Sequence, residues 1–587
     1  MDSSLVAQIR IEVLLNARLH AGSPNGKAVL GKVLGQNAEL RSQVKEVMDL
    51  VNKLVDEINQ MSLDEITSDL NQLSPDAVKS HEEKKSDRSQ KRRDDRKKLP
   101  DLKNAVKGRV VVRYAPDPSK YPHLGQGMNY LINRIYADKY DGKVILRFDD
   151  TNPTNVKPIY YDAIKEGMKW LGATWDVEIR ASQFLEDFYT AAKKLIQTGD
   201  LYVCFCENEL MKANRENSLT CVHRSHNSEI NLKEFDKMIT GKYKVGNAIV
   251  RLTGDLESDN HVMRDPVMLR IVKDQHPMLN TFYYVFPTYD FESAFLETKF
   301  EITHVIRSGE FGTMRQELQS YLIDKFGGEI PEFVSFGRFN IQGSPTQGRI
   351  IRELVESKVV SGWDDIRLFT LVGLKKRGIH PDTARLLIQE AGLTAKNATI
   401  AWSTLESKSK ELLEPRSKRY FFVEDPIKLK VENFEAQTLV LPIHPDHLEL
   451  GNRNLNITGE FYLSQLDTEK LIVGDEIRLK DLFNIKISEM KSKIITAEYT
   501  GNKIERLMTK IQWVTGENLR GTLQVPLLLQ PSKNKINQDS MLEISGKFEA
   551  SISKIDLGEI VQLERVGFAK LSIVNNKVVG HIVHSHN

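Results

Sequence analysis

The sequence predicts a multi-domain α/β protein with an all-β C-terminal part, and three observations support this prediction. At 587 residues the chain is too long for one hydrophobic core and should divide into roughly three to five domains. Between residues 108 and about 324, buried strands alternate with helices, which is typical of an α/β nucleotide-binding fold. After Pro415 short alternating strands, one of them expected over residues 456–462, are separated by Gly, Asn and Pro and indicate one or two β-barrels.

The N-terminal part, residues 1–78, is predicted to be a helical extension. Its apolar residues recur at steps of three and four, so they form one stripe of an amphipathic helix that needs a packing partner. From Lys79 to Lys98 almost no apolar residue occurs, and such a segment cannot offset its ordering entropy. Residues 79–107 are therefore predicted to be a charged linker or a solvated helix. In the helical extension before them, the apolar stripe consists of Leu40, Val44, Val47, Val51, Leu54 and Ile58.

Composition indicates a soluble protein of the cytoplasm. Hydrophobic residues make up 40% and charged residues 28%, and no stretch approaches the roughly 20 uninterrupted apolar residues of a membrane span. Residues 1–10 lack a signal-peptide pattern, and three cysteines are too few for a disulfide framework. The net charge of +2 neither requires nor excludes a nucleic-acid partner, because a balanced protein can still carry a local basic surface.

The run from Arg113 to Gln126 predicts an anion-binding site. Val110–Val112 should form a buried strand, a Pro-rich loop follows, and His123-Leu124-Gly125 precedes a helix expected over Met128–Tyr140. Backbone N–H groups at a helix N-terminus carry partial positive charge, so a phosphate chain can bind there if Gly125 allows close approach. His123 would then lie beside the phosphates. Taken alone, the run could also be an ordinary structural turn.

A pair of carboxylates, Asp149 and Asp150, ends the next predicted strand, Val144–Phe148. Carboxylates at the C-terminal end of a parallel strand face the ligand crevice and can hold an ammonium group or a ribose hydroxyl. A helix cap or a turn is the alternative for this pair.

All three cysteines lie close together in the sequence and predict a structural zinc site. Zinc prefers four tetrahedral nitrogen or sulfur ligands, and two closely spaced pairs separated by a loop supply them. Four protein ligands leave no open position for catalysis. Three buried reduced thiols are the alternative, but they do not explain the nearby histidine. The predicted ligands are Cys204, Cys206, Cys221 and His223.

Five segments together resemble class I aminoacyl-tRNA synthetases, in particular the archaeal and eukaryotic type of glutamyl-tRNA synthetase. The first resembles the "HIGH" motif preceded by Arg-x-Ala-Pro-x-Pro. The others resemble the Arg-Phe-Glu-Asp-Thr-Asp-Pro, Pro-Thr-Tyr, Thr-His-x-x-Arg-x-x-Glu and Gly-Trp-Asp-Asp-Pro-Arg segments of that family. In this chain they occupy Arg113–Gln126, Arg147–Pro153, Pro287–Tyr289, Thr303–Glu310 and Gly362–Arg367.

The resemblance implies an architecture and an activity. A Rossmann-like catalytic domain would span residues 108–361 with an acceptor-binding insertion at about 195–285, followed by a helical connecting segment (362–414) and β-barrel anticodon-binding domains (415–587). ATP and L-glutamate would form glutamyl-adenylate, and the glutamyl group would pass to the terminal adenosine of tRNA(Glu). Mg²⁺ would bridge the ATP phosphates, and the protein would act as a monomer.

The resemblance also assigns site residues by motif position. Asp149 would hold the amino group of glutamate, and Arg113 and Arg307 would hold its carboxylate, because a guanidinium binds a carboxylate bidentately. Catalytic roles fall to His123, Gly125, Gln126 and Arg349, and the substrate pocket would comprise Arg113, Ala115, Asp149, Tyr289, Arg307 and Glu310.

Several positions depart from the family pattern. Asp117 and Lys120 differ from the first motif, in which Lys120-Tyr121 replaces the glycine that usually precedes the histidine segment. Three further positions leave two alternatives open. Gln126 and Asn152 replace a histidine and an aspartate, and Gly348 stands where the second signature, the "KMSKS" loop, has a lysine. One alternative is a paralogue that binds tRNA without activating an amino acid. The other is glutaminyl-tRNA synthetase, although Arg307 favours an acidic substrate because an amide would leave this guanidinium unpaired.

Overall fold

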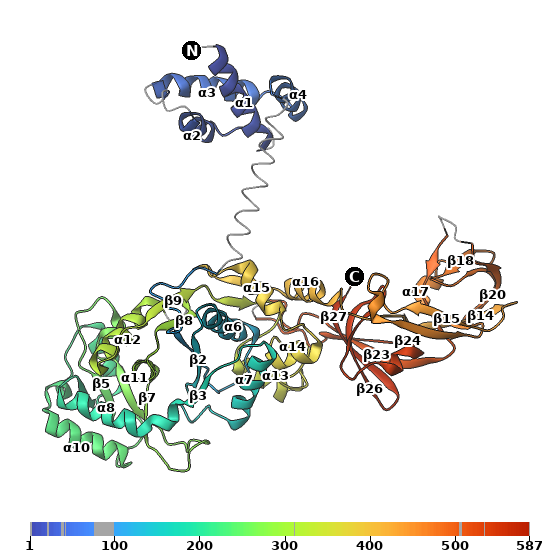
Figure 1. The fold of residues 1–587 in the computed structure, drawn as a ribbon. Coiled ribbons are helices and arrows are strands. Elements are labelled where there is room, and N and C mark those ends of the chain that lie inside the picture. Colours follow the sequence, from blue (N-terminus) through green and yellow to red (C-terminus); the bar gives the residue numbers. More distant parts are fainter. Residues whose placement is uncertain are drawn as a thin grey trace. The chain divides into compact units, whose positions relative to one another are not determined.

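The structure is a computed structural model that divides into two units, Met1–Lys98 and Leu99–Asn587 (Figure 1). Residue placement is described for 3–19, 23–36, 40, 43–74, 99–309, 312–503, 508–532 and 534–585.

The first unit is a helical bundle, and the predicted apolar stripe packs in its core. Val47, Val51, Leu54 and Ile58 are buried as predicted, but Val44 is 40% exposed because it begins its helix at the edge of the bundle. Residues 79–98 of the predicted linker lie outside the described residues. The helices are α1 (Ser3–Leu19), α2 (Gly26–Gln36), α3 (Val44–Ile58) and α4 (Leu63–Leu73).

The second unit begins with a parallel sheet of the expected nucleotide-binding type. Strands β1 (Val111–Tyr114), β2 (Lys143–Phe148) and β3 (Val177–Arg180) pair in parallel in that order. Strand β8 (His304–Ser308) pairs in parallel with β9 (Glu332–Phe336). Thr303, just before β8, donates its N–H to the carbonyl of Val111 over 3.0 Å, so β8 enters beside β1.

Helices α6 (Leu124–Lys139) and α7 (Pro158–Trp170) pack against this sheet. Helix α6 begins four residues before the predicted start at Met128. The expectation missed this turn because Gly125 and Gly127 have low helix propensity. The structure compensates with the side chain of His123, which caps the helix. Part of the segment 99–107, which the linker prediction included, contacts this helix: Tyr136 of α6 donates its hydroxyl to the carbonyl of Pro100, and the N–H of Leu102 donates to the hydroxyl of Tyr140, just after the helix.

An antiparallel four-stranded sheet with its own core lies where the insertion is predicted (Figure 1). Its strands are β4 (Leu201–Cys204), β5 (Ile249–Leu252), β6 (Val267–Ile271) and β7 (Val285–Pro287), and its helices include α8 (Leu185–Gln197), α9 (Asn208–Glu216) and α10 (Ser228–Ile239). Helices α11 (Tyr289–Lys299) and α12 (Gly312–Phe326) return the chain to the parallel sheet.

The connecting segment is mostly helical, with one difference from the prediction. Strand β11 (Ala398–Ile400) pairs in parallel with β10 (Phe339–Ile341). A three-residue strand whose partner lies far away in the sequence gives too short a pattern to recognise. Helix α13 (Gly348–Glu356) precedes this segment, and the helices within it are α14 (Leu371–Arg377), α15 (Thr383–Ala391) and α16 (Trp402–Leu413).

The C-terminal part forms two seven-stranded sheets, and each closes into a barrel. In each sheet the two edge strands are consecutive in the chain with one residue between them, Phe421 in one and Gln512 in the other. Each sheet must therefore curl until its edges meet. The first, in order, is β12 (Arg419–Tyr420), β25 (Ile560–Leu563), β26 (Gly567–Val574), β27 (Lys577–Ser585), β23 (Asn518–Pro526), β24 (Met541–Glu549) and β13 (Phe422–Glu424).

The second sheet differs from the prediction at one strand. Residues 456–462 were expected to form a single strand, but Gly459, at φ +84°, turns the chain there and separates two strands. The strands in order are β21 (Lys510–Ile511), β18 (Glu476–Leu479), β19 (Asn484–Lys491), β20 (Ile494–Gly501), β14 (Pro426–Glu432), β17 (Glu460–Ser464) and β22 (Trp513–Thr515), with a hairpin of β15 (Gln437–Pro442) and β16 (Asn452–Ile457) beside them.

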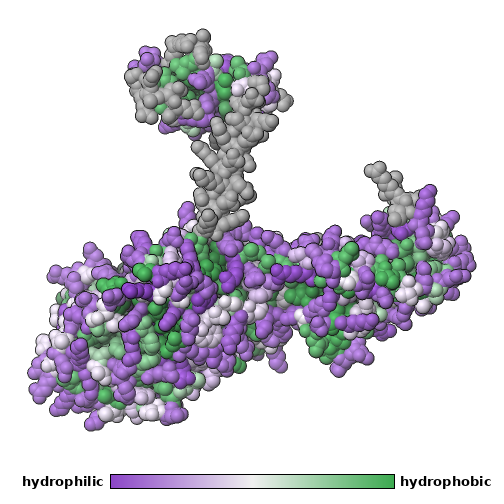
Figure 2. Space-filling model, in the orientation of Figure 1, coloured by the Kyte–Doolittle hydropathy of each residue, from purple (hydrophilic) through white to green (hydrophobic). Residues whose placement is uncertain are grey.

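In the described part of the chain, none of the helices combines the length and the apolar character that a membrane span needs. Hydrophilic side chains cover most of the visible face of the second unit, with small apolar patches between them (Figure 2).

Candidate active site

A cavity of about 370 Å³ lies where β1 ends and α6 begins. It brings together seven of the predicted site residues, which come from β1, the signature loop, α6, the start of α11 and β8. These residues are Arg113, Ala115, His123, Gly125, Gln126, Tyr289 and Arg307.

His123 is the N-cap of α6, and this role fixes its tautomer. The N–H of Gly125 donates to Nδ1 of His123 over 3.1 Å. Burial, together with the positive charges of Lys120 and Arg338, lowers the pKa of His123 to about 3. The ring is therefore neutral at pH 7, and because Nδ1 accepts a hydrogen bond, Nε2 carries the proton. This site thus offers an N–H donor rather than a charged imidazolium.

The signature loop is held in place from the connecting segment. The N–H of Leu124 donates to the carbonyl of Phe369, and the N–H of Leu371 donates to the carbonyl of Pro122, both over 2.9 Å. Tyr121 stacks on Trp363 of the Gly-Trp-Asp-Asp segment, with ring centroids 5.3 Å apart. These contacts fix the loop and orient the N-terminus of α6.

Arg113 is buried and anchored by an acid on α11. Its Nε and Nη2 donate to Oε1 of Glu297 over 3.0 and 2.9 Å. Ser293 donates to the same carboxylate oxygen and accepts a bond from Arg147. The two arginines and Glu297 thus form one buried charged network, which holds the guanidinium of Arg113 at the wall of the cavity.

Arg307 is buried on β8 and oriented by three side chains. Its Nη1 donates to Oε1 of Gln319 over 2.8 Å and to the hydroxyl of Tyr289 over 3.4 Å. The guanidinium carbon lies 5.2 Å from the ring centroid of Phe333. Arg113 and Arg307 therefore present two cations to one cavity, a suitable arrangement for a dicarboxylic ligand.

The carboxylate pair that follows β2 divides into two roles. Asp149 accepts Nε and Nη2 of Arg147 over 2.6 and 3.1 Å, and it does not line the cavity. Asp150 is fully buried and accepts bonds from the hydroxyl of Tyr161 and from the N–H and hydroxyl of Ser182. Asp150 therefore has a structural role, while Asp149 lies beside the network that holds Arg113.

The second signature region opens α13. Arg349, predicted to reach the phosphates, is 87% exposed and pairs with Glu353 over 2.9 Å. Gly348 lies against the side chain of Lys120. Glu310, a further predicted substrate residue, lies outside the described residues.

Two cations that sequence reasoning did not select also line the cavity, Lys120 and Arg338. Lys120 could have been identified from the sequence, because it lies in the signature loop at a position where the family has glycine. Arg338 follows β9 and had no local motif to identify it.

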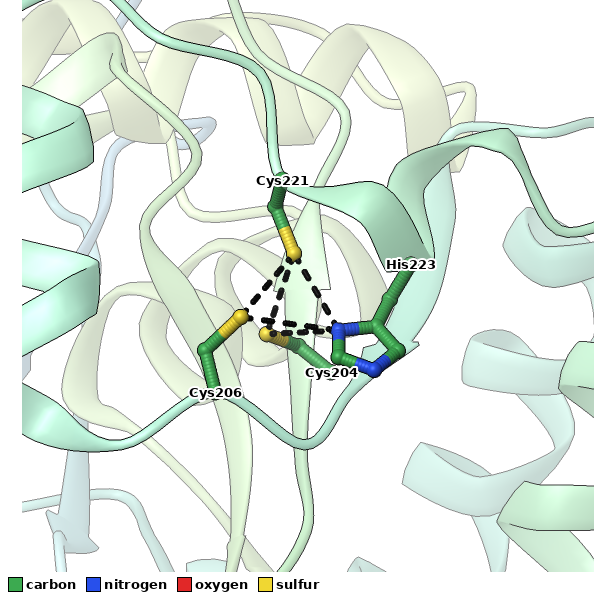
Figure 3. A group of neighbouring side chains, drawn as sticks. All are labelled: Cys204, Cys206, Cys221 and His223. Atoms are coloured by element: carbon green, nitrogen blue, oxygen red, sulfur yellow. Dashed lines mark hydrogen bonds between the residues drawn. The ribbon is translucent and has the colours of Figure 1, made fainter.

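The three cysteines and His223 converge on one point (Figure 3). Cys204 ends β4, Cys206 precedes α9, and Cys221 and His223 lie at a short 3₁₀ turn. Cys221 Sγ lies 3.3 Å from Cys206 Sγ and 3.6 Å from Cys204 Sγ, and 3.3 Å from Nδ1 of His223. A tetrahedral zinc ion with bonds of about 2.3 Å to sulfur sets sulfur atoms about 3.8 Å apart. The four side chains therefore fit zinc.

Family models and relatives of known function match this chain over most of its length. The catalytic domain of class I tRNA synthetases (E and Q) matches residues 109–415, and their anti-codon binding domain matches residues 417–501. A Glutamate--tRNA ligase of Thermococcus kodakarensis is 37% identical over 97% of this chain and 98% of its own length. One from Pyrococcus abyssi is 38% identical with the same coverage.

A Glutamate--tRNA ligase of Nitrosopumilus maritimus is 35% identical over 99% of this chain and its own full length. A solved glutamate tRNA ligase of Elizabethkingia meningosepticum matches 53% of this chain and 70% of its own at 19% identity, with a TM-score of 0.39. Both family domains and the near full-length relatives identify the same family. The chain belongs to the class I tRNA synthetases of the E and Q family.

Proposed function

We propose that this protein is a glutamate–tRNA ligase, which activates L-glutamate with ATP and transfers it to the terminal adenosine of tRNA(Glu). The observation that carries the proposal is the pairing of Arg113 and Arg307 in one cavity with the N-terminus of α6. Two guanidinium groups suit the two carboxylates of glutamate, and the helix N-terminus suits the phosphates of ATP. The names of the near full-length relatives support the same activity.

Activation requires an in-line exchange at the α-phosphorus of ATP. An oxygen of the glutamate α-carboxylate bonds to this phosphorus, and the bond to the bridging oxygen of pyrophosphate breaks. Such a reaction needs positioning and charge stabilisation more than a general base. The neutral His123 supplies Nε2–H as a donor to phosphate oxygen, and the N-terminal end of the α6 dipole adds partial positive charge. Bound Mg²⁺ supplies further charge neutralisation to the phosphates.

The glutamate side chain binds to Arg307, with Tyr289 beside it. Gln319 directs the guanidinium, which is buried and suits the carboxylate of glutamate better than the uncharged amide of glutamine. Asp149 is the candidate for the substrate ammonium group, and it can bind that group while one of its oxygens still accepts from Arg147.

The parts outside the catalytic sheet bind the tRNA. The two barrels receive the anticodon, whose splayed bases stack and hydrogen-bond, and the insertion receives the acceptor end. Zinc at the cysteine cluster fixes the fold of the insertion and takes no part in the chemistry, because all four ligands come from the protein.

An ATP–pyrophosphate exchange assay tests the proposal. We expect exchange with glutamate and tRNA(Glu), and at least tenfold less with glutamine in a direct competition. Absence of exchange in folded protein would favour the alternative of a tRNA-binding paralogue. Preference for glutamine would favour the sister synthetase instead.

A further inference from the structure

Two departures from the family pattern meet in the structure. Gly348 stands where the second signature has its lysine, and Lys120 stands where the first signature loop usually has glycine. A Cβ atom placed on Gly348 would lie 3.2 Å from Cδ and 3.3 Å from Cβ of Lys120. The position that lost a lysine therefore packs directly against a lysine from the other signature, more than 200 residues away in the sequence.

Lys120 contacts both the second signature region and the cavity. Its Nζ donates to the carbonyl of Thr346, in the second signature region, over 3.3 Å. The side chain also lines the cavity that holds His123, Gly125 and Gln126. The positive charge of Lys120 reaches His123, whose pKa it helps to lower. Lys120 thus bridges both signatures and carries its charge to the phosphate side of the site.

The arginines of the second signature region are placed less favourably. Arg349 is 87% exposed and paired with Glu353. Arg352 donates from Nη1 to the carbonyl of Ser119 over 3.4 Å, which attaches it to the outside of the first signature loop. Neither residue lines the cavity, whereas Lys120 does.

We infer that Lys120 takes over, from the first signature loop, the phosphate-stabilising role of the lysine that is absent at Gly348. This inference rests on the proposed function. As the glutamate oxygen bonds to the α-phosphorus, the bond to pyrophosphate breaks and negative charge develops on the leaving oxygen. The ammonium of Lys120 neutralises that charge. It matters most in the transition state, so its loss should lower kcat more than it raises the KM for glutamate.

The close contact also means that lysines at positions 120 and 348 exclude each other. A side chain at position 348 starts within 3.3 Å of the Lys120 stem, so two lysines there would compete for one space and repel each other. Removing the stem at position 120 frees that space. A lysine at position 348 should therefore be useful only when Lys120 is absent.

The test compares kcat and KM for glutamate in ATP–pyrophosphate exchange. Lys120→Met keeps the length of the stem and removes the charge, and we expect kcat to fall about 100-fold with the KM for glutamate within threefold of wild type. Lys143→Met is the matched control: Lys143 is exposed at the opposite end of β2 from Asp149, and its variant should retain wild-type kcat. Melting temperatures of all variants verify folding.

The double variant Lys120→Ala/Gly348→Lys tests whether a lysine at position 348 can replace Lys120. We expect it to recover at least tenfold over Lys120→Ala, while Gly348→Lys alone gains nothing over wild type. Lys120→Met with kcat within threefold of wild type would overturn the inference, and so would a larger loss of kcat in Arg349→Met than in Lys120→Met. If wild type itself shows no exchange, the proposed function fails, which is a separate outcome from the failure of Lys120.

Discussion

At the residue scale, His123 combines two tasks that usually fall to different side chains. Its Nδ1 satisfies a backbone N–H at the start of α6, where Ser, Thr, Asp or Asn would normally act. Its Nε2–H remains available for a phosphate oxygen. Because the helix cap fixes the tautomer, the donor is in place before any nucleotide binds, and no reorganisation is needed.

The low pKa of His123 predicts a pH effect on stability. An unfolded histidine takes up its proton near pH 6.5, whereas the folded ring resists protonation down to about pH 3. The unfolded state therefore binds more protons as pH falls below about 6.5, and the free energy of unfolding decreases in that range. Between pH 7 and pH 5, wild type should lose more stability in urea titrations than His123→Asn. Parallel losses in both proteins would contradict the shifted pKa.

Arg307 predicts a specific loss of glutamate binding. Arg307→Gln removes the cation that faces the side-chain carboxylate, and a hydrogen bond to a charged group contributes about 1.5–3 kcal/mol. The KM for glutamate in pyrophosphate exchange should rise by about 10- to 100-fold, with the KM for ATP nearly unchanged.

Arg315→Gln is the matched control for that variant. Arg315 pairs with Asp290 on the adjoining helix, is 44% exposed and does not line the cavity. Its KM for glutamate should stay within threefold of wild type. An equal rise in both variants would argue against Arg307 as the holder of the side chain.

At the scale of elements, the cysteine cluster joins the end of β4 to the 3₁₀ turn of the insertion. Protein purified without chelator should contain about one zinc per chain by atomic emission. Cys206→Ser should lose the metal and lower the melting temperature, because metal binding contributes directly to folding. His226→Gln is the control, since its ring lies beside His223 but outside the cluster and should leave the zinc content unchanged. The zinc site would be contradicted if the wild-type protein contained no zinc and Cys206→Ser had an unchanged melting temperature.

Elements with strong local patterns could be predicted, and contacts between distant elements could not. The strand, loop and helix around Arg113–Gln126 follow from apolar runs and turn residues, and the convergence of the cysteines follows from their spacing. The pairing of Asp149 with Arg147 links neighbouring residues at the end of β2, so it depends on local structure. The contact of Lys120 with Gly348 had no local signal, since only the tertiary fold joins them.

At the scale of the whole second unit, helix α14 connects the signature loop to the first barrel. At its N-terminal end Leu371 donates to Pro122, and at its C-terminal end Arg377 donates to the carbonyl of Ile582 in β27 over 2.9 Å. Arg377 is buried, pairs with Glu406 and lies 4.3 Å from the ring centroid of Trp402. One short helix thus contacts both the signature loop and the first barrel.

Arg377 therefore predicts a large effect on stability. Arg377→Ala leaves Glu406 largely buried without its partner and should lower the free energy of unfolding by about 3 kcal/mol or more. Lys376→Ala, on the same helix, removes an exposed pair with Asp364 and should cost less than about 1 kcal/mol. Urea denaturation measures both. Similar losses in the two variants would show that Arg377 does not hold this interface.

The seven-residue length of α14 has a consequence for how the gene can vary. Each residue of an α-helix advances about 1.5 Å and turns about 100°, since one turn takes 3.6 residues. A single insertion between Leu371 and Arg377 would swing the guanidinium to another side of the helix while Leu371 stayed on Pro122. Insertions and deletions should thus be absent from this helix in functional homologues, even where its side chains are exchanged, and an alignment of such sequences can verify this.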